Sequence, residues 1–197
     1  MVRGILYNNE NKFHLCQADF RSKMTLSLNQ ADFQELIEQA QQQGEMIDRQ
    51  SEFGIRASLP QKLGVGGDRL ICLRGGLTLQ IRNARLWQNT RIEQQHEHSF
   101  PLVSKFYLSS FSRIQTPGVS DIEDDYEEIA GCNYLYHLPN HTEFEEWRSD
   151  KLIQVVMVFA NVDYFRAFNL DRDALLNPLH KLIQGDANQR FHQSFGK

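Results

Sequence analysis

The chain has 197 residues, of which 41% are hydrophobic and 23% are charged, and its formal net charge is −4. This composition is typical of a globular domain, and the acidic balance does not suit a free-standing nucleic-acid binder, which needs a basic face. The longest apolar run, residues 155–160, is too short to span a membrane as a helix. The three cysteines, Cys16, Cys72 and Cys132, are widely spaced, which indicates a cytoplasmic location rather than a disulfide framework.

The N-terminal part contains one helix with readable ends. Residues 1–23 are polar and aperiodic, which predicts a flexible extension. Asn29 then stands three residues before Asp32, the spacing of a capping box, and Gly44 is the expected C-terminal stop. The apolar residues between them fall on one helical stripe, formed by Phe33, Leu36, Ile37 and Ala40. We therefore expect a short helix with one buried face.

From residue 45 onwards the sequence favours strands. GVGG at 64–67 and GG at 75–76 predict turns, and Leu77, Leu79 and Ile81 alternate with polar residues and are expected to face the core. The predicted strands cover residues 69–73, 77–82, 91–97 (as an edge strand), 102–109, 133–138, 143–147 and 152–159. Short strands separated by turns favour an antiparallel sandwich or barrel over a parallel α/β sheet.

The C-terminal part returns to helical patterns. Asn161 and Asp171 each suit a helix N-cap, Pro178 predicts a kink or a new start, and Gly185 a stop. An apolar strip on the last helix forms either a dimer seam or a contact with the same chain; it consists of Leu175, Leu176, Leu179, Leu182 and Ile183. Residues 186–197 show no periodicity, and their two phenylalanines, Phe191 and Phe195, have no evident partner.

His96-Glu97-His98 is the sharpest local pattern. Alternate residues on a strand point the same way, so both imidazoles would suit one metal ion, with His137 or His141 as a later ligand. The stretch that follows His98, SFPLVSKFYLS at 99–109, contains no glutamate, which leaves a cupin-type metal signature incomplete. The other interpretation is an edge strand with solvated imidazoles, and we assign no metal ligand.

Two acidic segments also admit two interpretations. His141, Glu143 and Glu145 would share one face of a strand, which suits a hard cation or a cationic ligand group. A solvated strand face anchored by Phe144 and Trp147 is the favoured interpretation. Residues 121–128 carry six acids, are expected to form a solvated loop and lack the spacing of a calcium loop.

No spacing in the sequence recommends a catalytic triad or a phosphate-binding loop, so we name no catalytic residue. What remains are basic, aromatic and imidazole side chains on the strand segments. Such side chains, lining the interior of a barrel, would form a small-molecule pocket. The candidate ligand-binding residues are Arg74, Trp87, Arg91, His96, His98, Lys105, Tyr107 and Trp147.

Four segments carry a family resemblance: LSLNQADFQELIEQAQQQGE, RLICLRGGLTLQIRNARL, HEHSFPLVSKFYLSSFSRI and GCNYLYHLPNHTEFEEWRSDKLIQVVMVFANVDYFRAF. Together they resemble the N-terminal half of AraC/XylS-type transcription regulators, in the pyochelin-regulator-like, cyanobacterial-type branch, over about residues 24–168. The resemblance implies a mainly β fold, a cupin-like antiparallel β-barrel with a short N-terminal helix and C-terminal helices. It also implies that the barrel senses a small effector such as a ferric siderophore and thereby controls iron-uptake genes.

On this resemblance, residues 24–160 form the ligand-sensing domain and residues 161–197 form helices for dimerisation or linkage. The few residues after Gly185 leave no room for a helix-turn-helix domain. We therefore expect a cytoplasmic homodimer that is not an enzyme, holds no tight cofactor and contacts DNA only through a domain absent from this chain. The alternatives are a metal-dependent cupin enzyme and a plain interaction module.

Overall fold

The computed structural model describes residues 25–45, 47–51, 54–97, 101–120, 122–166, 177–186 and 188–196. The expected N-terminal extension therefore lies outside the described residues, as do His98, Asp171, Leu175 and Leu176. In the described part of the chain, no helix combines the length and apolar character needed to cross a membrane.

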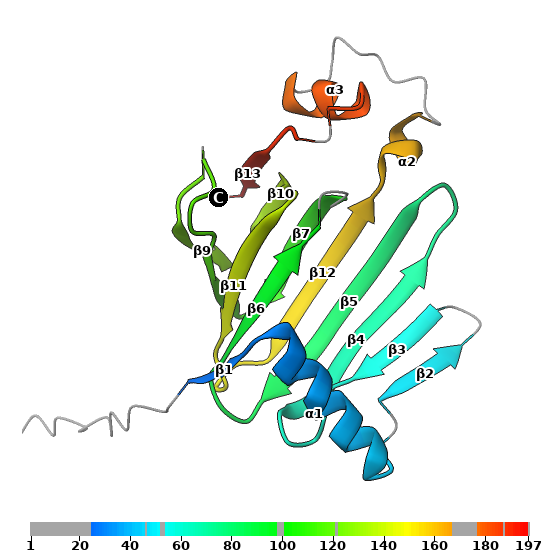
Figure 1. The fold of residues 1–197 in the computed structure, drawn as a ribbon, viewed down its shortest axis with the longest axis vertical. Coiled ribbons are helices and arrows are strands. Elements are labelled where there is room, and N and C mark those ends of the chain that lie inside the picture. Colours follow the sequence, from blue (N-terminus) through cyan, green and yellow to red (C-terminus); the bar gives the residue numbers. More distant parts are fainter. Residues whose placement is uncertain are drawn as a thin grey trace, which may run out of the picture.

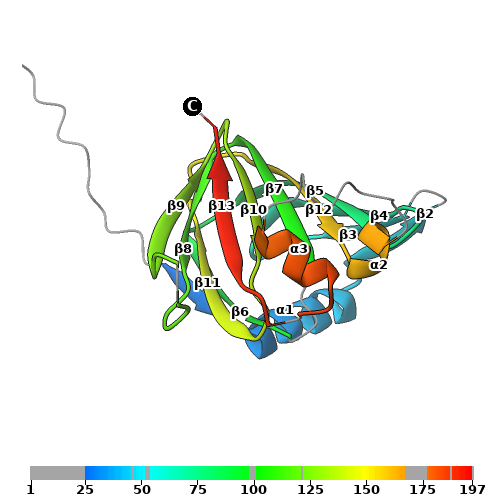
Figure 2. The same cartoon turned by 90° about the horizontal axis from the view of Figure 1, so that it is seen from above.

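Two β-sheets face each other and form most of the molecule (Figures 1 and 2). The five-stranded sheet has the order β1 (Leu26–Leu28), β6 (Thr90–His96), β11 (His141–Trp147), β8 (Phe111–Gln115) and β9 (Asp125–Ile129). The eight-stranded sheet has the order β13 (Phe191–Phe195), β10 (Asn133–His137), β7 (Leu102–Ser109), β12 (Ile153–Ala160), β5 (Leu77–Leu86), β4 (Gly64–Cys72), β3 (Gly54–Ser58) and β2 (Asp48–Ser51). Neighbouring strands are antiparallel except β1 and β6.

The fold is mainly β and cupin-like, with one N-terminal helix and short helices near the C-terminus. It is not the closed barrel that the family resemblance implied, because among the described strands none of one sheet is hydrogen-bonded to a strand of the other. Instead α1 (Gln30–Gln42) contacts β6 and, together with residues of both sheets, lines a space between them.

The expected N-terminal helix is confirmed together with its cap. The Asn29 side chain accepts a hydrogen bond from the Asp32 amide at 2.9 Å, and the Asp32 carboxylate accepts one from the Asn29 amide at 3.0 Å. Ala40 is buried, and Gly44 has a φ of +83° just past the C-terminus. Local sequence therefore fixes both ends of α1 and the face that it buries.

The prediction of a turn at residues 64–67 is wrong, because these glycines begin β4. Gly66 has a φ of +90°, and a Cβ there would lie 2.1 Å from the carbonyl oxygen of Asn83 on β5. Gly67 is equally close to β3, since its Cβ would lie 2.0 Å from the Ala57 carbonyl oxygen. The missing side chains let β4 lie close to both neighbours. The second predicted turn, at 75–76, is confirmed.

The predicted inward face of residues 77–82 is also wrong. Arg82 and Ala84, rather than Leu79 and Ile81, point toward the opposite sheet, since Arg82 reaches Glu145 there and Ala84 lines a cavity between the sheets. The same arrangement holds on β7, where Lys105 is 3% exposed and Leu108 is 64% exposed. On these two strands the polar residues face the interior, whereas on β12 the alternating apolar residues Ile153, Val155 and Met157 are buried in the core.

The C-terminal helices follow their local signals. The Asn161 side chain accepts a hydrogen bond from the Tyr164 amide at 3.0 Å and caps α2 (Val162–Arg166). Pro178 is the second described residue of α3 (Asn177–Ile183), and Gly185 follows that helix with a φ of +102°. Leu182 is 3% exposed within this chain, which favours the same-chain contact of the apolar strip.

Residues 191–195 correct the expectation that Phe191 and Phe195 have no partner. They form β13, which pairs with β10 from His137↔Phe191 to Asn133↔Phe195. The segment after α3 therefore returns to the eight-stranded sheet and adds a strand at its edge.

Candidate functional site

A cavity of about 390 Å³ lies between α1 and the two sheets. Phe33 and Ile37 line it from the helix, Ala57 from β3 and Trp147 from β11. Glu93, Gln94 and Gln95 of β6 also line it, and they lie beyond the three residues of β6 that pair with β1. The cavity therefore combines apolar walls with the polar edge of a strand, as small-molecule sites do.

Two charged side chains lie at the inner side of this cavity. The Arg82 guanidinium forms two hydrogen bonds to Asp68, with Nε–Oδ1 at 2.8 Å and Nη2–Oδ2 at 2.9 Å. Its Nη1 also lies 3.9 Å from Oε2 of Glu145, and its guanidinium carbon lies 5.5 Å from the Trp147 ring centre. Arg82 thereby connects the cavity wall to the charged interior between the sheets.

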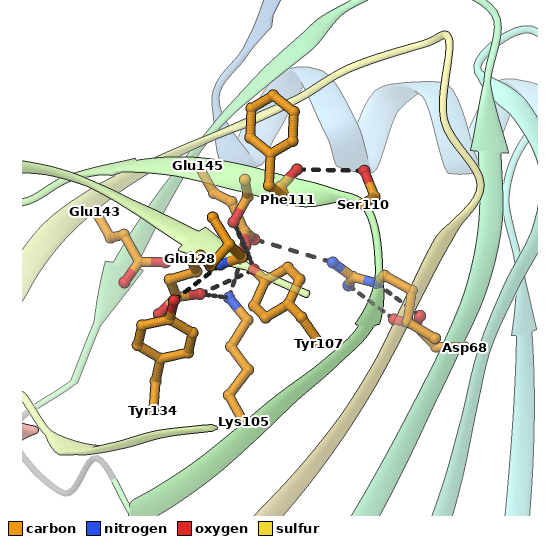
Figure 3. A network of polar contacts seen from close by, with 12 residues as sticks. Asp68, Lys105, Tyr107, Ser110, Phe111, Glu128, Tyr134, Glu143 and Glu145 are labelled. Atoms are coloured by element: carbon orange, nitrogen blue, oxygen red, sulfur yellow. Dashed lines mark hydrogen bonds and ion pairs between the residues drawn. The ribbon is translucent and has the colours of Figure 1, made fainter. Parts of the chain in front are cut away.

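Lys105 is the centre of that charged interior (Figure 3). Its Nζ lies 2.7 Å from Oε2 of Glu128 on β9 and 2.7 Å from Oε1 of Glu145 on β11. The Tyr107 hydroxyl donates to Glu128 at 2.8 Å and also contacts Ser112. All of these side chains are buried, so the network links both sheets with little access of water.

The pKa values follow from burial and from these pairings. Burial opposes the charge of Lys105, but Glu128 and Glu145 outweigh it and raise the lysine pKa well above its ordinary value. Burial raises the pKa of Glu128, partly offset by the nearby lysine. Burial alone would also raise the pKa of Glu143, but the neighbouring imidazoles of His141 and His96 outweigh it and lower that pKa well below the usual range.

His96, His141 and Glu143 form a second polar group in the interior. The two imidazole rings stack at 4.6 Å between centroids, and each Nε2 approaches the same carboxylate oxygen, Oε2 of Glu143. His96 pairs with His141 directly across β6 and β11. β6 lies between β1 and β11, so the prediction that residues 91–97 form an edge strand is wrong.

Four of the eight candidate ligand-binding residues lie in the interior. Lys105 and Tyr107 belong to the charged network, Trp147 lines the cavity, and His96 contacts Glu143. Among these, Trp147 alone is a wall of the 390 Å³ cavity.

Of the four other candidates, three lie away from this network and one is outside the described residues. Arg74 lies in the exposed turn between β4 and β5, and Trp87 is 54% exposed with its indole N–H donating to the Gln61 carbonyl at 2.7 Å. Arg91 donates to Gln115 and lies over the Phe144 ring. His98 is outside the described residues.

The favoured interpretation of two acidic segments is corrected. His141, Glu143 and Glu145 do share one face of β11, but that face is buried rather than solvated. In the segment 121–128, Glu128 is 1% exposed and pairs with Lys105, while Asp125 forms an exposed pair with Arg113. The buried cation Lys105 on β7 compensates the burial of Glu128 and Glu145.

Sequence reasoning missed Asp68 and Arg82 as interior residues. Asp68 directly follows the predicted turn at 64–67. Arg82 is one of the polar residues of a strand whose alternating apolar residues were expected to face the core. The available signal was a pair of opposite charges on neighbouring segments. Asp68 stands just before the strand predicted at 69–73, and Arg82 ends the strand predicted at 77–82.

Fold and interior together define a cupin-like domain with a small-molecule-sized cavity. The family model for the N-terminal domain of the regulatory protein PchR matches residues 66–195, and this chain belongs to that family. The domain is therefore a regulatory one. Comparison with curated proteins finds no match.

Solved structures show weaker similarity. The AraC-like transcriptional activator CuxR has 10% identity and a TM-score of 0.36, over 49% of this chain and 33% of its own. A cupin protein from Bacteroides fragilis has 15% identity and a TM-score of 0.36, over 62% and 86%. A mutant oxalate decarboxylase from Bacillus subtilis has 10% identity and a TM-score of 0.37, over 78% and 44%. The chain thus matches about a third of the length of CuxR, and these similarities assign no function.

Proposed function

We propose that this chain is the effector-sensing half of an AraC-type transcription regulator and that the cavity beside α1 is its effector site. The observation that carries the proposal is the cavity itself. Its volume of about 390 Å³ lies within the range typical of ligand pockets, and its lining is largely apolar with a few polar groups. Membership in the PchR N-terminal domain family supports a regulatory role for that site.

The charges of the lining narrow the class of effector. Asp48, Asp68 and Glu93 line the cavity, whereas Arg82 is its one cation among the lining residues and is paired with Asp68. A polyanionic ligand would meet net repulsion here, while a neutral or cationic ligand would not. Within the expected class of ferric siderophores, the site therefore favours a neutral or cationic complex, with Trp147 as an aromatic wall.

The position of α1 supplies a mechanism for signalling. Phe33 and Ile37 form one wall of the cavity, so a bound effector contacts α1 and both sheets at once. A ligand that binds more tightly to one placement of α1 shifts the population toward that placement. Coupling of about 1–3 kcal/mol is typical of such shifts and is enough to control a DNA-binding half.

Calorimetric titration with two iron complexes tests the proposal. We expect a ferric trihydroxamate that carries a free amine to bind and to raise the Tm, because its charge is positive. We expect a ferric tris-catecholate, which is strongly anionic, to bind much more weakly. No binding of either complex, or equal binding of both, would contradict the assigned effector class.

A pair of matched substitutions tests whether the effector binds in the cavity. Ala57→Leu adds a large side chain to the cavity wall and should weaken binding by about tenfold or more, since overpacking costs about 1–3 kcal/mol. Ala130→Leu makes the same change at an exposed position outside the cavity and should leave affinity unchanged. If Ala130→Leu weakened binding as much as Ala57→Leu, the cavity would not be the site.

Three further expectations belong to this proposal. The regulator acts as a cytoplasmic homodimer, it contacts DNA through a domain outside this chain, and its target genes serve iron uptake. Leu179 and Ile183 on α3 are half-buried and are the described residues of the apolar strip still available to a dimer seam. Sedimentation of a Leu179→Glu, Ile183→Glu variant tests that seam, because a folded variant that still dimerises would exclude it.

A further inference from the structure

A compact group of nitrogen and oxygen ligands lies in the interior, apart from the residues that line the effector cavity. His141 and Glu143 project from the same face of β11, and His96 projects beside them from β6. Nε2 of His96 is 3.7 Å and Nε2 of His141 is 3.9 Å from Oε2 of Glu143. One ligand atom from each of the three residues lies within 4.8 Å of the other two.

These distances suit a metal ion after a small adjustment. Bonds of about 2.0–2.1 Å in a tetrahedral site place neighbouring ligand atoms about 3.3–3.5 Å apart. The observed separations of 3.7 and 3.9 Å are only slightly larger. Two imidazoles and one carboxylate are ligands that first-row divalent metals accept, and they leave coordination positions open.

The charge of the interior also favours a cation at this place. Lys105 and Arg82 are the fixed cations of the buried network, and each is already paired with two carboxylates. Glu143 adds a further carboxylate, 7% exposed at its side chain, and the two imidazoles approach its Oε2. Buried carboxylates are expensive unless a cation compensates them, and a divalent ion would compensate this one.

The site is also accessible to an incoming ion. The His96 side chain is 14% exposed, whereas those of His141 and Glu143 are 3% and 7% exposed. The His96 ring therefore reaches the surface at one edge, while its Nε2 is enclosed like the other two ligands. An ion would enter past this imidazole, which is the most exposed of the three side chains.

We propose that His96, His141 and Glu143 bind one divalent first-row transition metal ion, such as Zn²⁺ or Co²⁺. The ligand set is not the His96–His98 pair of the sequence pattern, because the second imidazole comes from β11. The bound ion fixes β6 against β11 and so stabilises the five-stranded sheet. This site is distinct from the effector cavity. If it binds no metal ion, the proposed sensing function is unaffected.

Cobalt titration of chelator-treated protein tests the proposal. Co²⁺ held by nitrogen and oxygen ligands gives visible absorption bands, so we expect these bands to saturate at one ion per chain and Zn²⁺ to displace them. We also expect one equivalent of Zn²⁺ to raise the Tm of the wild-type protein. Absence of both effects in wild-type protein overturns the proposal without reference to any variant.

Substitutions then assign the ligands. Glu143→Gln and His96→Gln should each weaken Co²⁺ binding at least about tenfold, because each removes one of three ligands. His192→Gln changes another interior histidine that lies outside the group and should leave Co²⁺ affinity unchanged. Circular dichroism of the metal-free variants verifies their fold. Unchanged affinity in folded Glu143→Gln and His96→Gln would overturn the assignment, as would binding lost equally in His192→Gln.

Discussion

The Nζ of Lys105 on β7 lies 2.7 Å from Oε1 of Glu145 on β11, and this buried ion pair joins the two sheets. The lysine reaches a second carboxylate, Glu128 on β9, at the same distance. A single cation from the eight-stranded sheet therefore pairs with acids from two strands of the five-stranded sheet.

Lys105→Met should strongly destabilise the protein. The substitution leaves Glu128 and Glu145 buried without their shared cation, and breaking a buried pair in this way costs about 3–5 kcal/mol. Urea unfolding followed by circular dichroism measures the change in free energy. Arg113→Ala breaks an exposed pair with Asp125 and serves as the control, because exposed pairs contribute little to stability. Equal effects of the two substitutions would contradict the structural role of Lys105.

Asn29→Ala should lower the free energy of unfolding by about 1 kcal/mol, because it removes the capping box of α1. Asn29→Ser keeps a side-chain acceptor and should retain most of the stability. Thermal unfolding of both variants measures the difference. The cap would be irrelevant if serine and alanine at this position gave the same Tm.

The protein should lose stability below about pH 6.5 through His192. Burial lowers the pKa of this imidazole from 6.5, so the unfolded state takes up a proton before the folded state does. The stability that the neutral ring provides is present above pH 6.5 and is lost as the pH falls through the folded pKa. Glu143 and Lys105 are the charges that act on it, and the rings that face it are Tyr126, Tyr134 and Tyr136.

His192→Gln removes this titration and should flatten the dependence of Tm on pH just below pH 6.5. Differential scanning calorimetry across that range gives the slope for both proteins. Glu143, whose pKa is lowered, acts only below the ordinary glutamate range, so it does not mask the effect. An unchanged slope would show that His192 is not buried as described.

Gly66→Ala should destabilise the protein far more than Gly118→Ala. Both residues have positive φ, +90° and +74°, so each alanine costs about 1–2 kcal/mol in backbone strain. Only at Gly66 would the new Cβ also collide with a neighbouring strand, at the Asn83 carbonyl oxygen, whereas nothing lies within 4 Å of Gly118. Urea unfolding of the two variants compares them directly. Equal losses would mean that β4 does not lie so close to β5.

Features fixed by neighbours in sequence were predictable. The cap of α1, the cap at Asn161 and the stop at Gly185 each depend on one turn of chain, and all three are present. The bounds of β7 were also predicted correctly.

Features that depend on distant partners were not predictable in the same way. The inward face of β5 was assigned wrongly because Arg82 finds its partners on β4 and β11, far away in the sequence. The strand β13 was missed because its partner β10 lies over fifty residues earlier. The joining of His96 with His141 depends on the register of β6 against β11, which spacing along the chain does not reveal.

Fluorescence of a Trp87→Phe variant tests the central claim most directly. The chain has two tryptophans, and this variant leaves only Trp147, which is 2% exposed and lines the cavity. If the cavity is the effector site, an amine-bearing ferric trihydroxamate should quench Trp147 in a saturable way, with the same affinity as calorimetry gives. Calorimetric binding that leaves the emission of Trp147 unchanged would place the effector elsewhere and contradict the account.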